Sequence, residues 1–217
     1  MQQSGKNKKE INGYFVTLED EAELVDCKID GPINIDKYSM AKNCYFYGYT
    51  GIGRFSFLRN TDVGRHAAIG SRISIGGFNH PVNWLSVGSF QYRDTFDSFG
   101  ENLTNHIELN ENINKERTIL GHDSWIGDNV FVKRGVNIGI GSIVIAGSVV
   151  LNDVPDFTIC GGNPAVMIKK RFKDDLSKKI LETKWWELSI TELDKLDLPF
   201  NDPERCTDIL HDYRKSF

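Results

Sequence analysis

The chain has 217 residues, with 26 Lys and Arg against 30 Asp and Glu, and a formal net charge of −4. This length is enough for one domain with a sizeable core, and the charge argues against a nucleic-acid footprint spread over the surface. No apolar run approaches the roughly 20 residues that span a bilayer. The start, MQQSGKNKKE, has no apolar segment behind its charges, so we expect no secretory signal. The four cysteines form no CxxC pair, which predicts free thiols in a soluble cytoplasmic protein.

The first half of the chain has a degraded six-residue spacing of aliphatic residues. Val63, Ile69 and Ile75 lie six apart, and a glycine follows each of them directly. Extended backwards in sixes, the spacing reaches Phe57, Gly51, Tyr45, Ser39 and Ile33. We therefore place the start of the repeats near residue 33 and interpret residues 1–32 as an N-terminal lead-in.

A long aperiodic segment interrupts the repeats. Ile75 and Leu120 are 45 residues apart, which is not a multiple of six, so something is inserted between them. Residues 79–117 are rich in Asn, aromatic and charged residues and have no sustained period. An aperiodic stretch of this length inside a compact domain is usually functional or disordered. Its aromatic content favours an ordered loop that protrudes from the repeats.

The clearest repeat occupies residues 120–155. Aliphatic residues fall six apart there, at Leu120, Ile126, Val132, Ile138, Val144 and Val150. Each is followed four residues later by a small or β-branched residue: Ser124, Val130, Val136, Ser142, Ser148 and Val154. A helix needs apolar recurrence near 3.6 and a half-buried strand near 2, so a spacing of six fits neither. It predicts an all-β solenoid over residues 33–168, in which each hexad supplies one short strand and one turn.

Residues 169–217 are predicted to form a C-terminal helical extension. From Asp174 the period becomes helical, with Leu176, Ile180, Leu181 and Trp185 on one face. A second short helix is expected over residues 189–196. The polar tail after Pro199 receives no prediction.

The five histidines are the candidate general bases, because the ordinary pKa of histidine lies near neutrality. His80 stands where the first repeats break into the loop, and His122 follows a repeat glycine at a turn corner. Spacing alone does not choose between these two. His66 lies inside a repeat, His106 lies in the polar loop without an evident partner, and His211 belongs to the tail. Cys160 could form an acyl-enzyme, but a small buried residue is sufficient at its repeat position.

Three segments together resemble a known family. They are GGFNHPVNWLSVGSFQY, then GHDSWIGDNVFVKRGVNIGIGSIVIAGSVVLNDVPDFTICGGNPAVMIKKRF, then KILETKWWEL. They resemble the xenobiotic (type B chloramphenicol and streptogramin) acetyltransferases, which are hexapeptide-repeat acyltransferases with a left-handed parallel β-helix. The resemblance covers about residues 51–188. Left-handed coiling enters only through it, since isolated crossover connections are right-handed.

The resemblance implies a role for individual residues. His80 would be the general base, and Trp125 would lie near the thioester with its backbone amide available to the oxyanion. The acetyl-CoA site would be formed by small residues, the GNPA turn and the basic run after it: Ser142, Ala146, Gly147, Ser148, Asn163, Pro164, Ala165, Lys169, Lys170 and Arg171. The loop would contact the acceptor, through Asn79, Trp84, Phe90 and Tyr92. The chain departs from the family at Val166, Leu151 and Asn152, where carrier contacts are expected.

The resemblance also implies direct acetyl transfer without a metal, in a homotrimer whose sites lie between subunits. The acceptor would be a hydroxyl or amine of a carbohydrate, either a surface polysaccharide or a nucleotide-linked sugar. Two alternatives stay open: an antibiotic acetyltransferase, and a non-catalytic scaffold built from degraded repeats.

Overall fold

Three sheets, built mainly of parallel strands, form the faces of a β-solenoid. The computed structural model describes residues 7–110 and 114–215. The nine-stranded sheet contains β1 (Asn7–Ile11), β2 (Tyr14–Leu18), β5 (Ile33–Ile35), β8 (Thr50–Ile52), β11 (Ala68–Ile69), β14 (Trp125–Ile126), β17 (Ile143–Val144), β19 (Thr158–Gly162) and β20 (Ala165–Lys170). The six-stranded sheet contains β3 (Glu23–Val25), β6 (Met40–Lys42), β9 (Phe57–Arg59), β12 (Ser74–Ile75), β15 (Phe131–Val132) and β18 (Val149–Val150). The five-stranded sheet contains β4 (Lys28–Ile29), β7 (Tyr45–Phe46), β10 (Thr61–Val63), β13 (Thr118–Leu120) and β16 (Asn137–Ile138).

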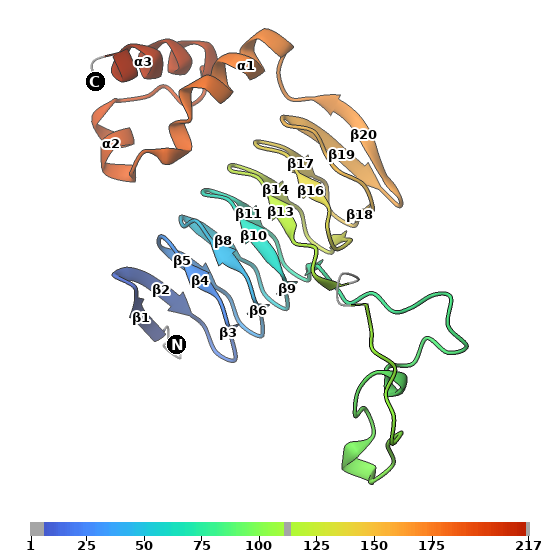
Figure 1. The fold of residues 1–217 in the computed structure, drawn as a ribbon. Helices are drawn as coiled ribbons and strands as arrows, with labels where there is room; N and C mark the ends of the chain where they lie inside the picture. Colours follow the sequence, from blue (N-terminus) through green and yellow to red (C-terminus); the bar gives the residue numbers. More distant parts are fainter. Residues whose placement is uncertain (1–6, 111–113, 216–217) are drawn as a thin grey trace.

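Successive strands visit the nine-, six- and five-stranded sheets in turn, so three strands make one coil (Figure 1). Strands of neighbouring coils pair in parallel, as β5 does with β8 and β14 with β17. The two antiparallel pairs, β1 with β2 and β19 with β20, lie at the two ends of the nine-stranded sheet. The predicted all-β solenoid is confirmed.

The coils differ in length between the two halves of the solenoid. In the second half Ile126 pairs with Val144, which is 18 residues further on and agrees with three hexads. In the first half Ile35, Ile52 and Ile69 are paired at intervals of 17, so one corner of each coil is a residue shorter. The buried residues of the early coils include Phe46, Ile52 and Leu58.

The backward extension in sixes was therefore wrong by one residue at Phe57, Gly51 and Tyr45, which are only partly buried. The parallel ladders also begin before residue 33, because β2, β3 and β4 pair with β5, β6 and β7. The division of the chain into domains at residues 33 and 168 stays a prediction.

The long loop leaves the solenoid between β12 and β13. The coil resumes in register after it, since Thr61 of β10 pairs with Thr118 of β13. The described residues of the loop include the short 3₁₀ helices η1 (Ser89–Gln91) and η2 (Asp97–Phe99). Figure 1 shows the loop projecting away from the coils, at the corner where the six- and five-stranded sheets meet. The loop lies between the two runs of repeats, as the break in the six-residue spacing predicted.

The C-terminal extension is helical, as predicted. It contains α1 (Asp174–Thr183), the 3₁₀ helix η4 (Trp185–Glu187), α2 (Ile190–Lys195) and α3 (Pro203–Lys215). At the start of α2, Ser189 and Glu192 form a reciprocal capping box. The Asp202 carboxylate accepts a 3.1 Å hydrogen bond from the Arg205 amide at the start of α3, a helix that the sequence analysis did not predict.

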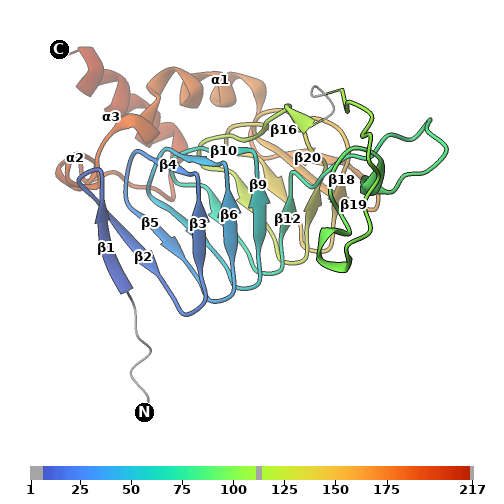
Figure 2. The same ribbon diagram turned by 60° about the horizontal axis from the view of Figure 1, so that its bottom comes forward.

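These helices fold back along the solenoid beside the corner between the five- and nine-stranded sheets (Figure 2). None of the helices among the described residues is long and apolar enough to cross a membrane.

Candidate active site

His80 is held at the root of the loop by a hydrogen bond that fixes its tautomer. Its Nδ1 atom lies 2.7 Å from the Val87 carbonyl oxygen. A carbonyl oxygen only accepts, so the proton of the neutral ring is on Nδ1 and the Nε2 atom keeps its lone pair. The Tyr92 hydroxyl lies 3.2 Å from the same Nδ1 atom. The His80 side chain is exposed, so Nε2 is available to take a proton from a substrate.

Two of the cavities among the described residues border His80. The first, of about 230 Å³, is lined by Phe78, Asn79, His80, Tyr92, Arg93, Leu109 and Asn114. The second, of about 410 Å³, is lined by His80, Pro81, Val82, Asn83, Trp84, Leu109 and Asn110. Of the four expected acceptor residues, the loop therefore brings Asn79, Trp84 and Tyr92 to cavities that His80 also lines. Phe90 lines neither cavity and instead stacks on Phe96 at 6.3 Å.

The rival base, His122, has no free lone pair. Its Nδ1 atom accepts a 2.9 Å hydrogen bond from the Arg65 amide, so the proton of the neutral ring is on Nε2. The ring stacks on Trp186 at 5.3 Å, and burial, followed by the charge of Arg65, lowers its pKa. His122 thus holds the C-terminal helices against the solenoid.

Trp125 lies on the outer face of the nine-stranded sheet, with 52% of the residue exposed. Its backbone amide donates a 2.9 Å hydrogen bond to the Ser142 carbonyl of the next coil. The expectation that this amide serves the oxyanion was therefore wrong, because the ladder already uses its proton. The exposed indole keeps its expected place near the thioester as a prediction.

The expected acetyl-CoA residues divide into buried and exposed groups. Ser142 and Ser148 are fully buried, and their hydroxyls donate to the Gly139 and Ile145 carbonyls. They cannot line the pantetheine arm, and this expectation is corrected. Ala146 and Gly147 are exposed at the turn from β17 to β18. Of the GNPA residues, Asn163 and Pro164 form the turn between β19 and β20, and Ala165 begins β20.

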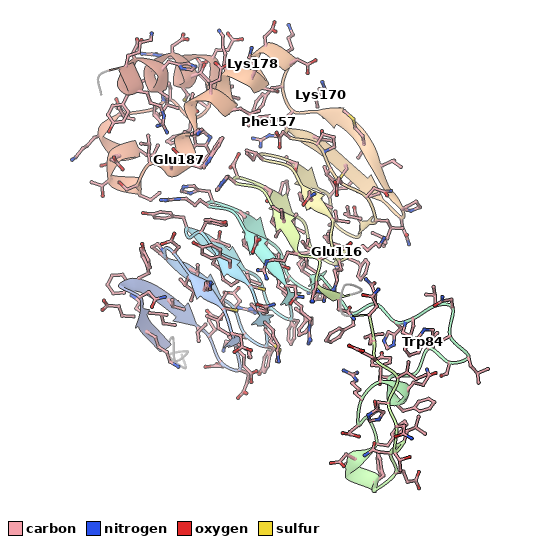
Figure 3. All side chains as sticks on the ribbon, in the orientation of Figure 1. Trp84, Glu116, Phe157, Lys170, Lys178 and Glu187 are labelled. Atoms are coloured by element: carbon pink, nitrogen blue, oxygen red, sulfur yellow. The ribbon has the colours of Figure 1, made fainter. Side chains whose placement is uncertain are left out.

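The basic run after this turn is also divided. Lys169 and Lys170 are exposed on β20, where Figure 3 labels Lys170. Lys170 pairs with Asp174 at the start of α1. Arg171 points inward instead, where Nη1 donates to the Gly141 carbonyl at 2.5 Å and lies 3.3 Å from the Asp123 carboxylate. It lines a cavity of about 210 Å³ between the last coil and the C-terminal helices. These two contacts engage Nη1, and the side chain stays partly exposed, so its expected role as a phosphate ligand stays a prediction.

The candidate base and the candidate carrier residues lie at different corners of one chain. The loop with His80 leaves at the corner between the six- and five-stranded sheets. The Ala146–Gly147 turn joins β17 to β18, at the corner between the nine- and six-stranded sheets. Figure 3 shows Trp84 in the protruding loop, away from Lys170 and Phe157 at the end of the solenoid. Within a single chain the candidate base and the candidate carrier residues are therefore separated from each other.

Comparison with known proteins identifies the family. A protein named chloramphenicol acetyltransferase from Klebsiella aerogenes is 30% identical over 184 residues, which cover 80% of this chain and 84% of the relative. The chain belongs to the xenobiotic acetyltransferase family of the hexapeptide-repeat acyltransferases. As a member it is an acetyltransferase that uses acetyl-CoA. No family model matches the chain.

Two further relatives are informative. The Escherichia coli (strain K12) protein WcaF, named for acetyl transfer in colanic acid biosynthesis, is 37% identical over 113 residues, 52% of this chain and 60% of WcaF. The solved structure of a point mutant of AntD, an N-acyltransferase from Bacillus cereus, in complex with dTDP-4-amino-4,6-dideoxyglucose and coenzyme A, matches 77% of this chain and 88% of AntD. Its TM-score is 0.56 at 20% identity, which shows a shared fold.

Proposed function

We propose that the chain transfers the acetyl group of acetyl-CoA to a hydroxyl or amine of a carbohydrate, with His80 as the general base. The observation that supports the acceptor class is the composition of the two cavities beside His80. Asn79, Asn83 and Asn110 line these cavities together with the rings of Trp84 and Tyr92. Carboxamides donate and accept hydrogen bonds with sugar hydroxyls, and aromatic rings pack on the apolar faces of sugar rings.

The tautomer of His80 supports the mechanism. The Nε2 lone pair takes the proton from the acceptor hydroxyl or amine as its oxygen or nitrogen attacks the thioester carbonyl. The tetrahedral intermediate collapses with cleavage of the carbon–sulfur bond, and the Nε2 proton passes to the departing CoA thiolate. His80 is thereby returned to its neutral form. The Val87 carbonyl stabilises the imidazolium between these two steps, because it accepts a hydrogen bond from the Nδ1–H group throughout.

We further propose that the active assembly is a homotrimer with sites between subunits. The separation of His80 and the Ala146–Gly147 turn onto different corners supports this assembly, because a groove between two chains joins one corner of each. The exposed Trp125 then faces the same groove from the neighbouring chain. We expect the reaction to take place in the cytoplasm, where acetyl-CoA is available.

An antibiotic acceptor is the second candidate. The relative named chloramphenicol acetyltransferase aligns over 84% of its own length, whereas the alignment with WcaF covers 60%. The cavities beside His80 also contain apolar residues, such as Pro81 and Leu109, against which a drug ring could pack.

A thiol-release assay tests the proposal. Acetyl-CoA is supplied with a panel of sugars, nucleotide-linked amino sugars (including dTDP-4-amino-4,6-dideoxyglucose), chloramphenicol and a macrolide. We expect turnover with a carbohydrate member and a loss of roughly 10²–10⁴-fold in His80→Ala, the usual scale of general base catalysis. Turnover with only the antibiotics would select the second candidate. An absence of turnover with every member, although acetyl-CoA binds, would support the scaffold alternative.

A further inference from the structure

The root of the loop contains a buried arginine that bridges its two ends. Arg134, in the corner after β15, is only 3% exposed. Its guanidinium donates to the carbonyl oxygens of Gly76 and Gly77, where the chain leaves the solenoid, with a Nε–O distance of 2.9 Å to Gly77. It also donates to the carbonyl of Asn114, at 2.8 Å, where the chain returns. One side chain therefore holds the first and last segments of the loop at a fixed separation.

Asn114 extends this bridge to the residue next to His80. Its side-chain oxygen accepts a 2.9 Å hydrogen bond from the Asn79 amide, and its side-chain nitrogen donates to the Asn79 carbonyl at 3.3 Å. The Asn60 side chain donates at 3.0 Å to the same Asn114 carbonyl that Arg134 contacts. Asn79 is thus held on both its peptide groups, directly before His80.

The remaining contacts at this root leave little room for adjustment. Gly76 has a positive φ of 72°, and a Cβ atom there would lie 2.0 Å from the Arg59 carbonyl oxygen. Phe78, which lies between Gly77 and Asn79 in the chain, contacts Arg59. The Arg59 guanidinium lies 4.1 Å from the centre of the Phe78 ring. The backbone that leads to His80 is therefore fixed by contacts at Gly76, Gly77, Phe78 and Asn79.

We propose that Asn114 and Arg134 are positioning residues for His80: they fix the backbone at Gly76–Asn79 so that the Nε2 atom of His80 is aimed at the acceptor. This inference rests on the proposed role of His80 as the base. Arg134 is buried beneath the loop, and Asn114 acts through the peptide groups of Asn79. A displacement of about 1 Å at a reacting group lowers a rate by about 10²-fold, so removal of the Asn114 side chain should lower kcat by roughly 10–100-fold.

A double-mutant cycle separates positioning from a general structural role. Asn114→Ala is made alone and in the His80→Ala background, with the most active acceptor of the thiol-release panel. The matched control is Asn105→Ala, which truncates an exposed asparagine of the same loop. We expect the loss in kcat for Asn114→Ala in the otherwise unchanged protein, no further loss in the His80→Ala background, and an unchanged KM for acetyl-CoA. Asn105→Ala should behave as the unchanged protein in all three.

The other outcomes overturn the inference. An equal loss in both backgrounds would mean that Asn114 acts independently of His80, and an unchanged kcat in Asn114→Ala would mean that the bridge is dispensable. If His80→Ala alone retained full activity, the proposed function would fail and the positioning role with it. Arg134→Lys, which keeps the charge but cannot contact both ends of the loop, provides the second variant. It should reproduce the kcat loss of Asn114→Ala and likewise add nothing to His80→Ala.

Discussion

The contact between the solenoid and the C-terminal helices should weaken as pH falls, because two histidines are stacked inside it. His66 lies between the rings of Tyr49 and Trp185, with both centroid distances 5.1 Å. Its Nε2 atom is buried and has no hydrogen-bond partner among the described residues. The pKa of His66 is lowered to about 4, mainly by burial and then by the charges of Arg65 and of the second histidine, His122.

The sign of the effect follows from this lowered pKa. Well above pH 6.5 His66 is neutral in the folded and unfolded chains, so its titration does not affect stability there. As pH falls from 6.5 to 4 the unfolded chain takes up the proton first, so the folded state loses stability. At pH 5 a lowering of the pKa from 6.5 to about 4 corresponds to a loss of about 2 kcal/mol in the free energy of unfolding. Partial exposure of the ring reduces the expected loss to about 1 kcal/mol.

The assay compares urea unfolding at pH 7.5 and 5.0, at one protein concentration, for the unchanged protein and for His66→Phe. A phenyl ring keeps the stack between Tyr49 and Trp185 but cannot be protonated. We expect its free energy of unfolding to fall by about 1 kcal/mol less between the two pH values than that of the unchanged protein. His211→Phe, in α3 and outside the stacks, is the control and should keep the original dependence. An equal loss in His66→Phe and the unchanged protein would refute the reasoning.

Three further predictions follow from the site and the helices. Replacing Lys169 and Lys170 together by Ala should raise the KM for acetyl-CoA severalfold and weaken the salt dependence of that KM, at constant kcat. The effect is modest because exposed charge contacts are weak and screened by salt. A KM that is unchanged at two ionic strengths would mean that neither lysine contacts acetyl-CoA. Arg171→Ala should instead lower the thermal unfolding midpoint, since it removes the contacts to Gly141 and Asp123; a KM effect without a change in midpoint would contradict this. Light scattering should give the mass of a trimer. A fully active monomer would contradict the proposal that the site lies in a groove between subunits.

The clean repeat was readable from sequence because a solenoid core repeats one environment. Every coil needs an aliphatic residue at the same inward position, so Ile126 and Val144 stand out without any structure. The same logic, applied further, would have placed Ser142 and Ser148 correctly. They occupy the position that Val130 and Val136 fill in other repeats, and all four are buried. Their small size suggested a ligand contact, whereas their place in the period indicated the core.

Other features left weaker signals. Each coil of the first half has 17 residues, one fewer than three hexads, so the inward positions shift by one residue per coil. A constant spacing of six therefore misses them. The helix α3 did have a signal, Asp202 before Pro203, in a segment for which no prediction was made. The partner of His80 had none, because the Val87 carbonyl belongs to the backbone and its position depends on the fold of the loop. The use of the Trp125 amide in the ladder likewise follows only from the strand pairing.

The most direct test of the account is complementation between two inactive chains. His80→Ala removes the base, and Ala146→Trp, at the exposed turn, is designed to block the carrier groove without touching the core. If each site takes His80 from one chain and the Ala146–Gly147 turn from its neighbour, every mixed trimer contains one intact site. Random co-assembly of equal amounts of the two differently tagged chains should then restore about one quarter of the unmutated thiol-release rate. If co-assembled trimers form but stay as inactive as either parent, the two halves of the site belong to one chain and the shared-groove account is contradicted.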